Sequence, residues 1–260
     1  MNISSAIVGR EVGPDRQTID KRWLMAYNAA LGVVSDAPHP LFAVCYEWPA
    51  TNQLRVATGL QEINARLVHA QHDLVIHRLP KAGETLSVTA RVVAAVQRSP
   101  GAFVVFRLSA HAGDEPVSTT HYGMLYRGVT LEDGDRGEVE DPPKHESKLK
   151  QVGELAVSAT AGHVYTECAR IWNPIHTDPE YARAAGLPDI ILHGTATLAL
   201  SVSKLTKSAK RVRCRFAGMV LMPGTLTVHA SPHLSAAGDE VLFETRNAKG
   251  EAVIERGRIG

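Results

Sequence analysis

An internal repeat constrains the fold of this chain more than any other feature of its sequence. Residues 80–88 and 223–228 each place a turn containing proline and glycine before a strand of alternating apolar and polar residues. Two further pairs of strand-like segments follow in the same order, 103–107 with 241–245 and 115–117 with 251–253. Because similar turns and strands recur in one order, the sequence predicts two copies of one structural unit.

A polar segment separates the two copies. Residues 131–150 read LEDGDRGEVEDPPKHESKLK, which is almost all charge, glycine and proline and has no apolar period. Such a composition is typical of a linker. We therefore expect an N-terminal domain at 1–130, a charged linker at 131–150 and a C-terminal domain at 151–260.

Each half combines one long helix with several strands. Apolar residues at helical spacing predict an amphipathic helix over 19–34, and a second helix is expected at 193–207. Strict alternation predicts a half-buried strand at 211–216 with its arginines pointing outward, and residues 241–258 form a predicted hairpin. Helices followed by runs of antiparallel strands indicate the α+β class, with a long helix wrapped by a curved sheet in each half.

Charge and cysteine content exclude several classes of function. The 260 residues include 28 Lys and Arg against 27 Asp and Glu, so the net charge is +1 and the chain has no overall basic footprint for nucleic acid. The three cysteines, Cys45, Cys168 and Cys214, lie far apart, which favours free thiols in a reducing compartment. Neither a secretory signal nor the run of about 18 apolar residues of a membrane helix is found. We expect a cytoplasmic protein that does not enter a membrane.

The densest group of polar residues is NPIHTDP at 173–179. A strand predicted from 163 to about 171 ends before Asn173, because the residue that precedes a proline is extended. Thr177 or Asp178 can cap a helix that has Pro179 at its first position. Capping does not account for His176, which is therefore a candidate acid or base.

A second group, LHGTA at 192–196, begins the second predicted helix. The first N–H groups of a helix lack partners within the helix, and the helix dipole favours negative charge beside them. Gly194 has no side chain to keep a substrate oxygen away from these N–H groups. The sequence therefore predicts a backbone oxyanion hole at Gly194.

The two groups together, NPIHTD at 173–178 and LHGTA at 192–196, resemble the MaoC-like hydratase/dehydratase family. The resemblance is strongest over 165–205, and the N-terminal half is similar to the degenerate first hot dog of two-repeat members. It implies a double hot-dog fold and an acyl-CoA substrate in fatty acid metabolism. The implied activity is that of a hydro-lyase, an R-specific enoyl-CoA hydratase or 3-hydroxyacyl-CoA dehydratase. The resemblance implies no metal or redox cofactor, since CoA is part of the substrate.

The resemblance also assigns roles to residues of the C-terminal half. His176 matches the catalytic histidine and is expected to be the main acid or base. Asn173 matches the asparagine that helps to order the site, and the backbone N–H of Gly194 matches the oxyanion donor. His193 and Thr195, which flank Gly194, are expected to bind substrate.

A basic group within 204–215 is the predicted site for the phosphates of CoA. Arg213 and Arg215 belong to it, and basic side chains suit phosphate oxygens. Nucleic acid is a poor alternative, because aromatic residues make up only 5% of the chain. Two fused hot dogs already form a pseudo-dimer, and a further homodimer is plausible.

The chain departs from the family at one catalytic position. The family motif, Ser-Gly-Asp-x-Asn-Pro-x-His, places an aspartate five residues before the histidine. Here its first three positions are Ala169, Arg170 and Ile171, and an isoleucine cannot activate water or orient an imidazole. The possible replacements are Asp178, Glu167, Asp189 and His193, while Asp73 and Glu47 cannot be placed from sequence. Among these, His193 is favoured because it lies beside the expected oxyanion donor.

The missing aspartate keeps two other functions open. One is a hot-dog acyl-CoA thioesterase, which would need a carboxylate near the thioester carbon. The other is a subunit that binds acyl-CoA without turnover, and the loss of the aspartate favours it.

Overall fold

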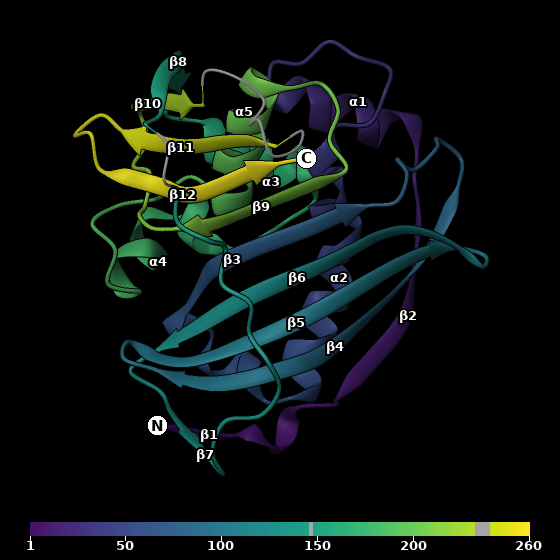
Figure 1. The fold of residues 1–260 in the computed structure, drawn as a ribbon, viewed down its shortest axis with the longest axis vertical. Coiled ribbons are helices and arrows are strands. Elements are labelled where there is room, and N and C mark those ends of the chain that lie inside the picture. The colour runs from purple at the N-terminus through teal and green to yellow at the C-terminus, as the bar shows by residue number, and fades with distance from the viewer. Residues whose placement is uncertain (146–147, 232–239) are drawn as a thin grey trace. The chain divides into compact units, whose positions relative to one another are not determined.

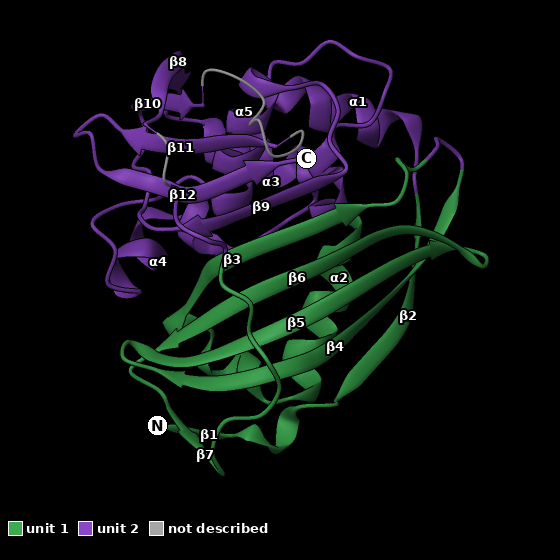
Figure 2. Cartoon of the chain, viewed as in Figure 1, with its two compact units in different colours: residues 1–18, 46–80, 84–141 green, residues 19–45, 81–83, 142–260 purple. Residues whose placement is uncertain are grey.

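The computed structural model describes residues 1–145, 148–231 and 240–260, and it divides into two compact units (Figure 2). Unit 1 comprises Met1–Thr18, Tyr46–Pro80 and Glu84–Asp141, and unit 2 comprises Ile19–Cys45, Lys81–Gly83 and Pro142–Gly260.

Unit 1 consists of an antiparallel sheet and one long helix (Figure 1). The strands lie in the order β2-β4-β5-β6-β3, and α2 (Ala43–Ala57) is the helix, most of which belongs to this unit. The bounds of the five strands are Glu11–Thr18 (β2), Leu67–Ile76 (β3), Thr85–Arg98 (β4), Gly101–Ala112 (β5) and Glu115–Arg127 (β6). Two short strands, β1 (Asn2–Ser4) and β7 (Thr130–Glu132), form a separate parallel pair.

Alternation along the strands explains which face of this sheet is buried. In β4, Leu86, Val88, Ala90 and Val92 are fully buried and alternate with less buried residues. Side chains alternate between the two faces of a strand, so this pattern gives the sheet one apolar face. The apolar face and buried residues of α2 such as Leu54 form the core of the unit.

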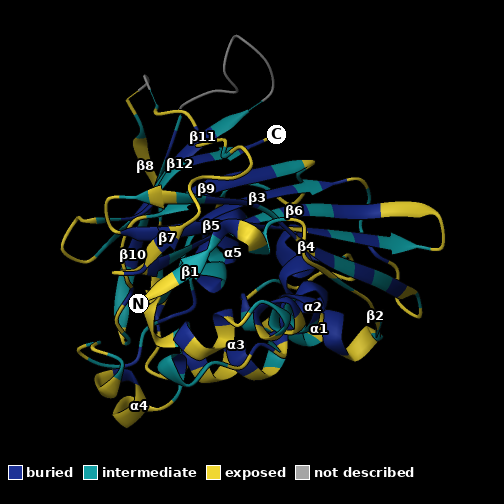
Figure 3. Ribbon diagram, turned by 90° about the horizontal axis from the view of Figure 1, so that it is seen from below, coloured by how far each residue is buried: buried dark blue, intermediate teal, exposed yellow. Residues whose placement is uncertain are grey.

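Unit 2 contains a second antiparallel sheet with strands in the order β8-β10-β11-β12-β9. The bounds of these strands are Lys150–Val157 (β8), Arg211–Phe216 (β9), Gly224–Ala230 (β10), Val241–Asn247 (β11) and Ala252–Ile259 (β12). The long helix α5 (Gly194–Leu205) has a mostly buried face, and Ser201 Oγ lies 2.7 Å from Thr245 Oγ1 of β11. The shorter helices are α1 (Lys21–Ala30), α3 (Ala161–Ala169) and α4 (Pro179–Ala184), the last of which is largely exposed (Figure 3).

Four segments of 3-10 helix complete the secondary structure of the described residues. They are η1 (Ser5–Ile7), η2 (Pro40–Phe42), η3 (Leu60–Arg66) and η4 (Pro174–His176). Among the described residues, no helix is long and apolar enough to cross a membrane.

The predicted repeat is confirmed by strand topology. When the strands of each sheet are numbered 1 to 5 along the chain, both sheets have the spatial order 1-3-4-5-2. The two turns recognised in the sequence precede β4 and β10, which hold the same position in their sheets. The α+β class, with a long helix and a curved antiparallel sheet in each copy, is also confirmed.

Three local predictions need correction. The segment predicted as a strand from 163 to 171 is helix α3. The helix predicted over 19–34 is α1, which is shorter and packs against α3 within unit 2. Arg213 of β9 does not point outward as predicted, because only 7% of it is exposed.

The compact units do not follow the order of the chain that the predicted domains 1–130 and 151–260 assume. Residues 19–45 belong to unit 2, because α1 finds its apolar partner in α3. The predicted linker at 131–150 contains the end of β7, the start of β8 and the change of unit after Asp141. Residues 146–147 of this linker lie outside the described residues.

Candidate functional site

Two histidines that the sequence places 17 residues apart lie face to face in unit 2. His176 ends η4, and His193 immediately precedes α5. Their imidazole rings are stacked, with 3.6 Å between centroids and an interplanar angle of 25°. Both side chains are buried, so the structure brings together two of the predicted site residues.

Hydrogen bonding fixes the tautomer of His176. Its Nδ1 atom lies 2.8 Å from the carbonyl oxygen of Ile191, which can only accept a hydrogen bond. Nδ1 therefore carries the proton in the neutral ring, and Nε2 has the free lone pair. Burial lowers the pKa of His176 to about 4, against a smaller opposing effect of the Ile191 carbonyl. At neutral pH His176 is thus a neutral imidazole whose Nε2 can accept a proton.

His193 also contacts α3. Its Nε2 atom lies 3.3 Å from the hydroxyl of Thr166. Burial and, to a smaller extent, the neighbouring His176 hold the pKa of His193 well below its usual range, while the backbone of Ile171 opposes this shift. Both stacked rings are therefore neutral at pH 7, which avoids two like charges in contact.

A row of hydroxyl groups continues from His193, and sequence reasoning missed it. The ring of Tyr165 lies 4.9 Å from that of His193, and its hydroxyl donates to Thr195 Oγ1 at 3.2 Å. Tyr27 of α1 brings its own hydroxyl within 3.3 Å of the Tyr165 hydroxyl. Burial raises the pKa of Tyr165 well above its usual value, so this hydroxyl remains protonated. Thr195, a predicted substrate-binding residue, is thus part of a polar wall beside the imidazole pair.

Asn173 shapes the turn that carries His176. Its Oδ1 atom accepts a hydrogen bond from the Ile175 backbone N–H at 3.4 Å, and its carbonyl accepts one from the His176 N–H at 3.1 Å. Both bonds lie within the turn, which agrees with an ordering role. Gly162 of α3 lets this turn pack closely, since an added Cβ would lie 2.5 Å from the His176 carbonyl oxygen.

Gly194 opens α5 as predicted, and its lack of a side chain also has a packing reason. An added Cβ would lie 3.3 Å from the ring of Phe216 on β9. The preceding His193 makes no side-chain capping hydrogen bond to the helix, so it does not occupy the N–H groups of the first turn. The oxyanion role of the Gly194 N–H stays a prediction.

The carboxylates considered as replacements for the family aspartate are engaged elsewhere or exposed. Asp178 is the N-cap of α4, where Oδ1 accepts from the backbone N–H groups of Glu180 and Tyr181. Asp189 accepts from its neighbour Ile190 and lies 3.5 Å from an Arg183 nitrogen. Glu167 lies on the exposed side of α3.

The remaining candidates are engaged in an ion pair or belong to the other unit. Arg215 of β9 forms a half-exposed ion pair with Glu255 at 3.5 Å. Glu47 and Asp73 belong to unit 1, whereas His176 belongs to unit 2. Within the described part of the chain, no group of three or more His, Cys, Asp or Glu side chains is arranged to hold a metal ion.

Comparison with known proteins shows which families this chain resembles. Residues 141–252, which include both histidines, match the sequence model of the MaoC like domain. Residues 141–252 are therefore similar to a MaoC like domain. It is 23% identical over 227 residues to 3-hydroxyacyl-thioester dehydratase X of Mycobacterium tuberculosis, which covers 85% of this chain and 80% of that protein. Peroxisomal multifunctional enzyme type 2 of Mus musculus is 23% identical over 222 residues, 77% of this chain.

The chain spans only part of some of these relatives. It covers 28% of the mouse enzyme and 50% of a probable enoyl-CoA hydratase 2 of Dictyostelium discoideum. Among solved structures, a MaoC-like dehydratase from Phytophthora capsici has a TM-score of 0.82 at 19% identity, over 96% of this chain and 95% of that one. A Mycobacterium tuberculosis protein described as having a double hotdog fold has a TM-score of 0.63 at 15% identity, over 97% and 95% of the two chains. The fold is the double hot dog.

Ile171 lies just after the end of α3. Arg170 adopts the left-handed conformation with φ 57°, and the N–H groups of Arg170 and Ile171 bond back to the carbonyls of Glu167 and Thr166. This is a Schellman ending, in which glycine is the usual left-handed residue. Ile171 is 4% exposed, so an apolar side chain is buried at the position where the sequence motif predicts an aspartate.

Proposed function

We propose that this chain is a hydro-lyase for acyl-CoA thioesters, an R-specific enoyl-CoA hydratase or 3-hydroxyacyl-CoA dehydratase. The observation that carries the proposal is the tautomer of His176. Its Nδ1–H donates to the Ile191 carbonyl, which leaves Nε2 as a base next to the start of α5. The relatives named as hydratases and dehydratases support this class of reaction.

The proposed hydration uses one base and one oxyanion donor. Nε2 of His176 takes a proton from water as the water oxygen bonds to the β-carbon of the enoyl group. The electron pair of the double bond moves toward the thioester, whose oxygen accepts from the Gly194 N–H. The histidine then returns the proton to the α-carbon, so that one water is added without a net change in protons. Dehydration is the reverse.

Turnover is expected to be slow for short, unbranched enoyl-CoA. A pKa of about 4 makes His176 a weak base, and Ile171 supplies no second base. General acid–base catalysis contributes roughly 10²–10⁴-fold for each well-placed group. The chain should therefore fall short of an ordinary hydratase by a factor of this order.

Binding without turnover is the second candidate, and buried Ile171 is the observation that favours it. A site with an oxyanion donor and an apolar wall can hold a thioester even where water is not activated. A thioesterase is not favoured, because the candidate carboxylates of unit 2 are exposed or engaged elsewhere.

The test is a panel of 2-enoyl-CoA and 3-hydroxyacyl-CoA thioesters with chiral analysis of the product. We expect the R product, and a His176→Ala variant should lose roughly 10²-fold or more in turnover. His229→Ala, in β10 of the same unit, is the matched control and should retain the wild-type rate. An S product, or a His176→Ala variant as fast as wild type, would contradict the proposal. Tight binding with no turnover of any thioester would instead support the second candidate.

A further inference from the structure

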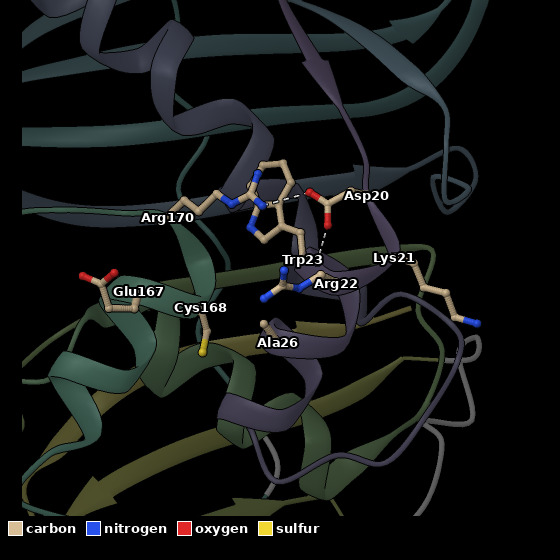
Figure 4. Close-up of a pocket in the computed structure, with 8 residues that line it drawn as sticks. All are labelled: Asp20, Lys21, Arg22, Trp23, Ala26, Glu167, Cys168 and Arg170. Atoms are coloured by element: carbon tan, nitrogen blue, oxygen red, sulfur yellow. Dashed lines mark hydrogen bonds and ion pairs between the residues drawn. The ribbon is translucent and has the colours of Figure 1, made fainter.

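A cavity of about 650 Å³ lies between α1 and α3, entirely within unit 2 (Figure 4). Its walls are the first turns of α1 and the last turn of α3 with the residue that follows it. The lining residues are Asp20, Lys21, Arg22, Trp23, Ala26, Glu167, Cys168 and Arg170. None of these belongs to the imidazole pair or to the basic group predicted at 204–215.

The charges in this cavity favour an anion. Three of the lining residues are cationic and two are acidic. The carboxylate of Asp20 is already engaged, because it accepts from the Trp23 backbone N–H at 2.8 Å and from Arg170 at 2.9 Å. These bonds lower the pKa of Asp20, so it remains ionised and paired. Lys21 and Arg22, both exposed, are then opposed only by Glu167 among the lining side chains.

Arg170 presents its guanidinium in a fixed orientation. The group lies 4.2 Å from the centroid of the Trp23 ring, and its Nη2 atom is tied to Asp20. A guanidinium has five donors in a planar fork, so one bond to Asp20 leaves an edge that can bind two phosphate oxygens. Arg170 holds this position despite a left-handed backbone that favours glycine.

Trp23 adds an unpartnered donor in the wall of the cavity. Only 3% of this residue is exposed, and its indole Nε1–H has no hydrogen-bond partner among the described residues. Buried donors are normally satisfied in folded proteins, and leaving one unpaired is costly. A ligand oxygen that reaches the edge of the indole ring beside the Arg170 guanidinium would supply the missing acceptor.

We propose that this cavity, in place of the basic group predicted at 204–215, binds phosphate groups, and specifically the phosphorylated adenosine end of CoA. This assignment of the ligand rests on the proposed function. The cavity and the imidazole pair meet at the end of α3, because Arg170 lines the cavity while the backbone of the next residue, Ile171, faces the His193 imidazole. The pantetheine arm would then connect the phosphates at Arg22 and Arg170 with the thioester at His176.

Binding of CoA, 3′,5′-ADP and pantetheine, measured by calorimetry, tests the cavity without any need for turnover. Arg22→Glu removes the exposed cation, and Arg170→Gly removes the guanidinium while suiting the left-handed backbone. Each change should weaken CoA and 3′,5′-ADP by about tenfold or more, since charge-assisted hydrogen bonds are lost. Lys249→Glu, in the β11–β12 turn, changes the net charge of the same unit equally and should have little effect. Pantetheine binding should be unchanged in all three variants.

The outcomes separate this proposal from the proposed function. If the variants weaken 3′,5′-ADP but no thioester is hydrated, the phosphate site stands and the hydro-lyase proposal fails. If wild-type protein does not bind 3′,5′-ADP, or Arg22→Glu and Lys249→Glu affect CoA equally, the phosphate site is wrong whatever the activity.

Discussion

Replacement of the buried Glu47 by glutamine should change how the stability of the protein depends on pH. Glu47 of α2 is fully buried in unit 1. Its Oε1 accepts from Thr120 at 2.6 Å and Ser118 at 3.2 Å, and its Oε2 accepts from the Tyr122 hydroxyl at 2.8 Å. Burial raises the pKa of this carboxyl from 4.5 to about 7, and the three hydroxyls only partly offset the effect.

The sign and size of the effect follow from this shift. Between pH 4.5 and 7 the folded protein keeps a proton on Glu47 that the unfolded chain releases, so the folded state loses stability as pH rises. One pKa unit is worth about 1.4 kcal/mol, so raising the pKa from 4.5 to about 7 corresponds to about 3 kcal/mol. Glutamine does not ionise, and Glu47→Gln should therefore gain about 3 kcal/mol relative to wild type between pH 4.5 and pH 8.

Urea unfolding of wild type and Glu47→Gln at several pH values from 5 to 8 measures this difference. Comparing the two proteins at each pH cancels the contributions of the other titrating groups. Glu62→Gln, on the exposed surface of unit 1, controls for loss of a carboxyl as such. A stability difference between Glu47→Gln and wild type that stays constant from pH 5 to pH 8 would refute the reasoning.

Three further predictions concern the histidines and the site turn. Wild-type stability should rise between about pH 4 and pH 6.5. In this range three histidines are protonated in the unfolded chain, but they stay neutral in the folded protein because burial lowers their pKa to about 4. Urea unfolding measures the change, and a fall in stability would contradict the prediction. These histidines are His39, His69 and His176. Gly162→Ala should cost about 1–3 kcal/mol of stability and reduce turnover, because the Cβ of the alanine would displace the carbonyl of His176. Unfolding and kinetics that match wild type would contradict this packing. Asp178→Ala should cost about 1 kcal/mol of stability in thermal unfolding, because α4 loses its N-cap. Asp178→Asn keeps a capping oxygen and should retain both the stability and the turnover rate of wild type. A lower turnover rate in Asp178→Asn would indicate that Asp178 is catalytic.

Much of the fold could be predicted because its signals are local. The turns before β4 and β10 and the alternation of the strands are visible within short windows of sequence. The sequence predicts a strand where helix α3 lies, because the short apolar pattern fits either period. The end of α3 also depends on Arg170 in a left-handed conformation rather than on glycine. The membership of α1 in unit 2 depends on packing against α3, which chain order does not reveal.

The site was predictable only where a motif carried it. His176 and His193 were found through the motif, but Tyr165 and Thr166 required α3 to be recognised as a helix. Glu47 could not be placed from sequence, although its partners left a signal. Ser118 and Thr120, with Tyr122 beyond them, alternate along β6 and so present three hydroxyls on one face.

The most direct test of the central claim is to restore the missing carboxylate and measure hydration of crotonyl-CoA. In the proposed hydro-lyase, His176 is already in place and the site lacks only the carboxylate that the motif predicts at Ile171. Ile171→Asp should therefore raise kcat roughly 10²–10⁴-fold, and Ile171→Asn, which cannot act as a base, should not. The gain should vanish when His176→Ala is combined with Ile171→Asp. A folded Ile171→Asp protein that is no faster than wild type, or a gain that persists without His176, would contradict the account.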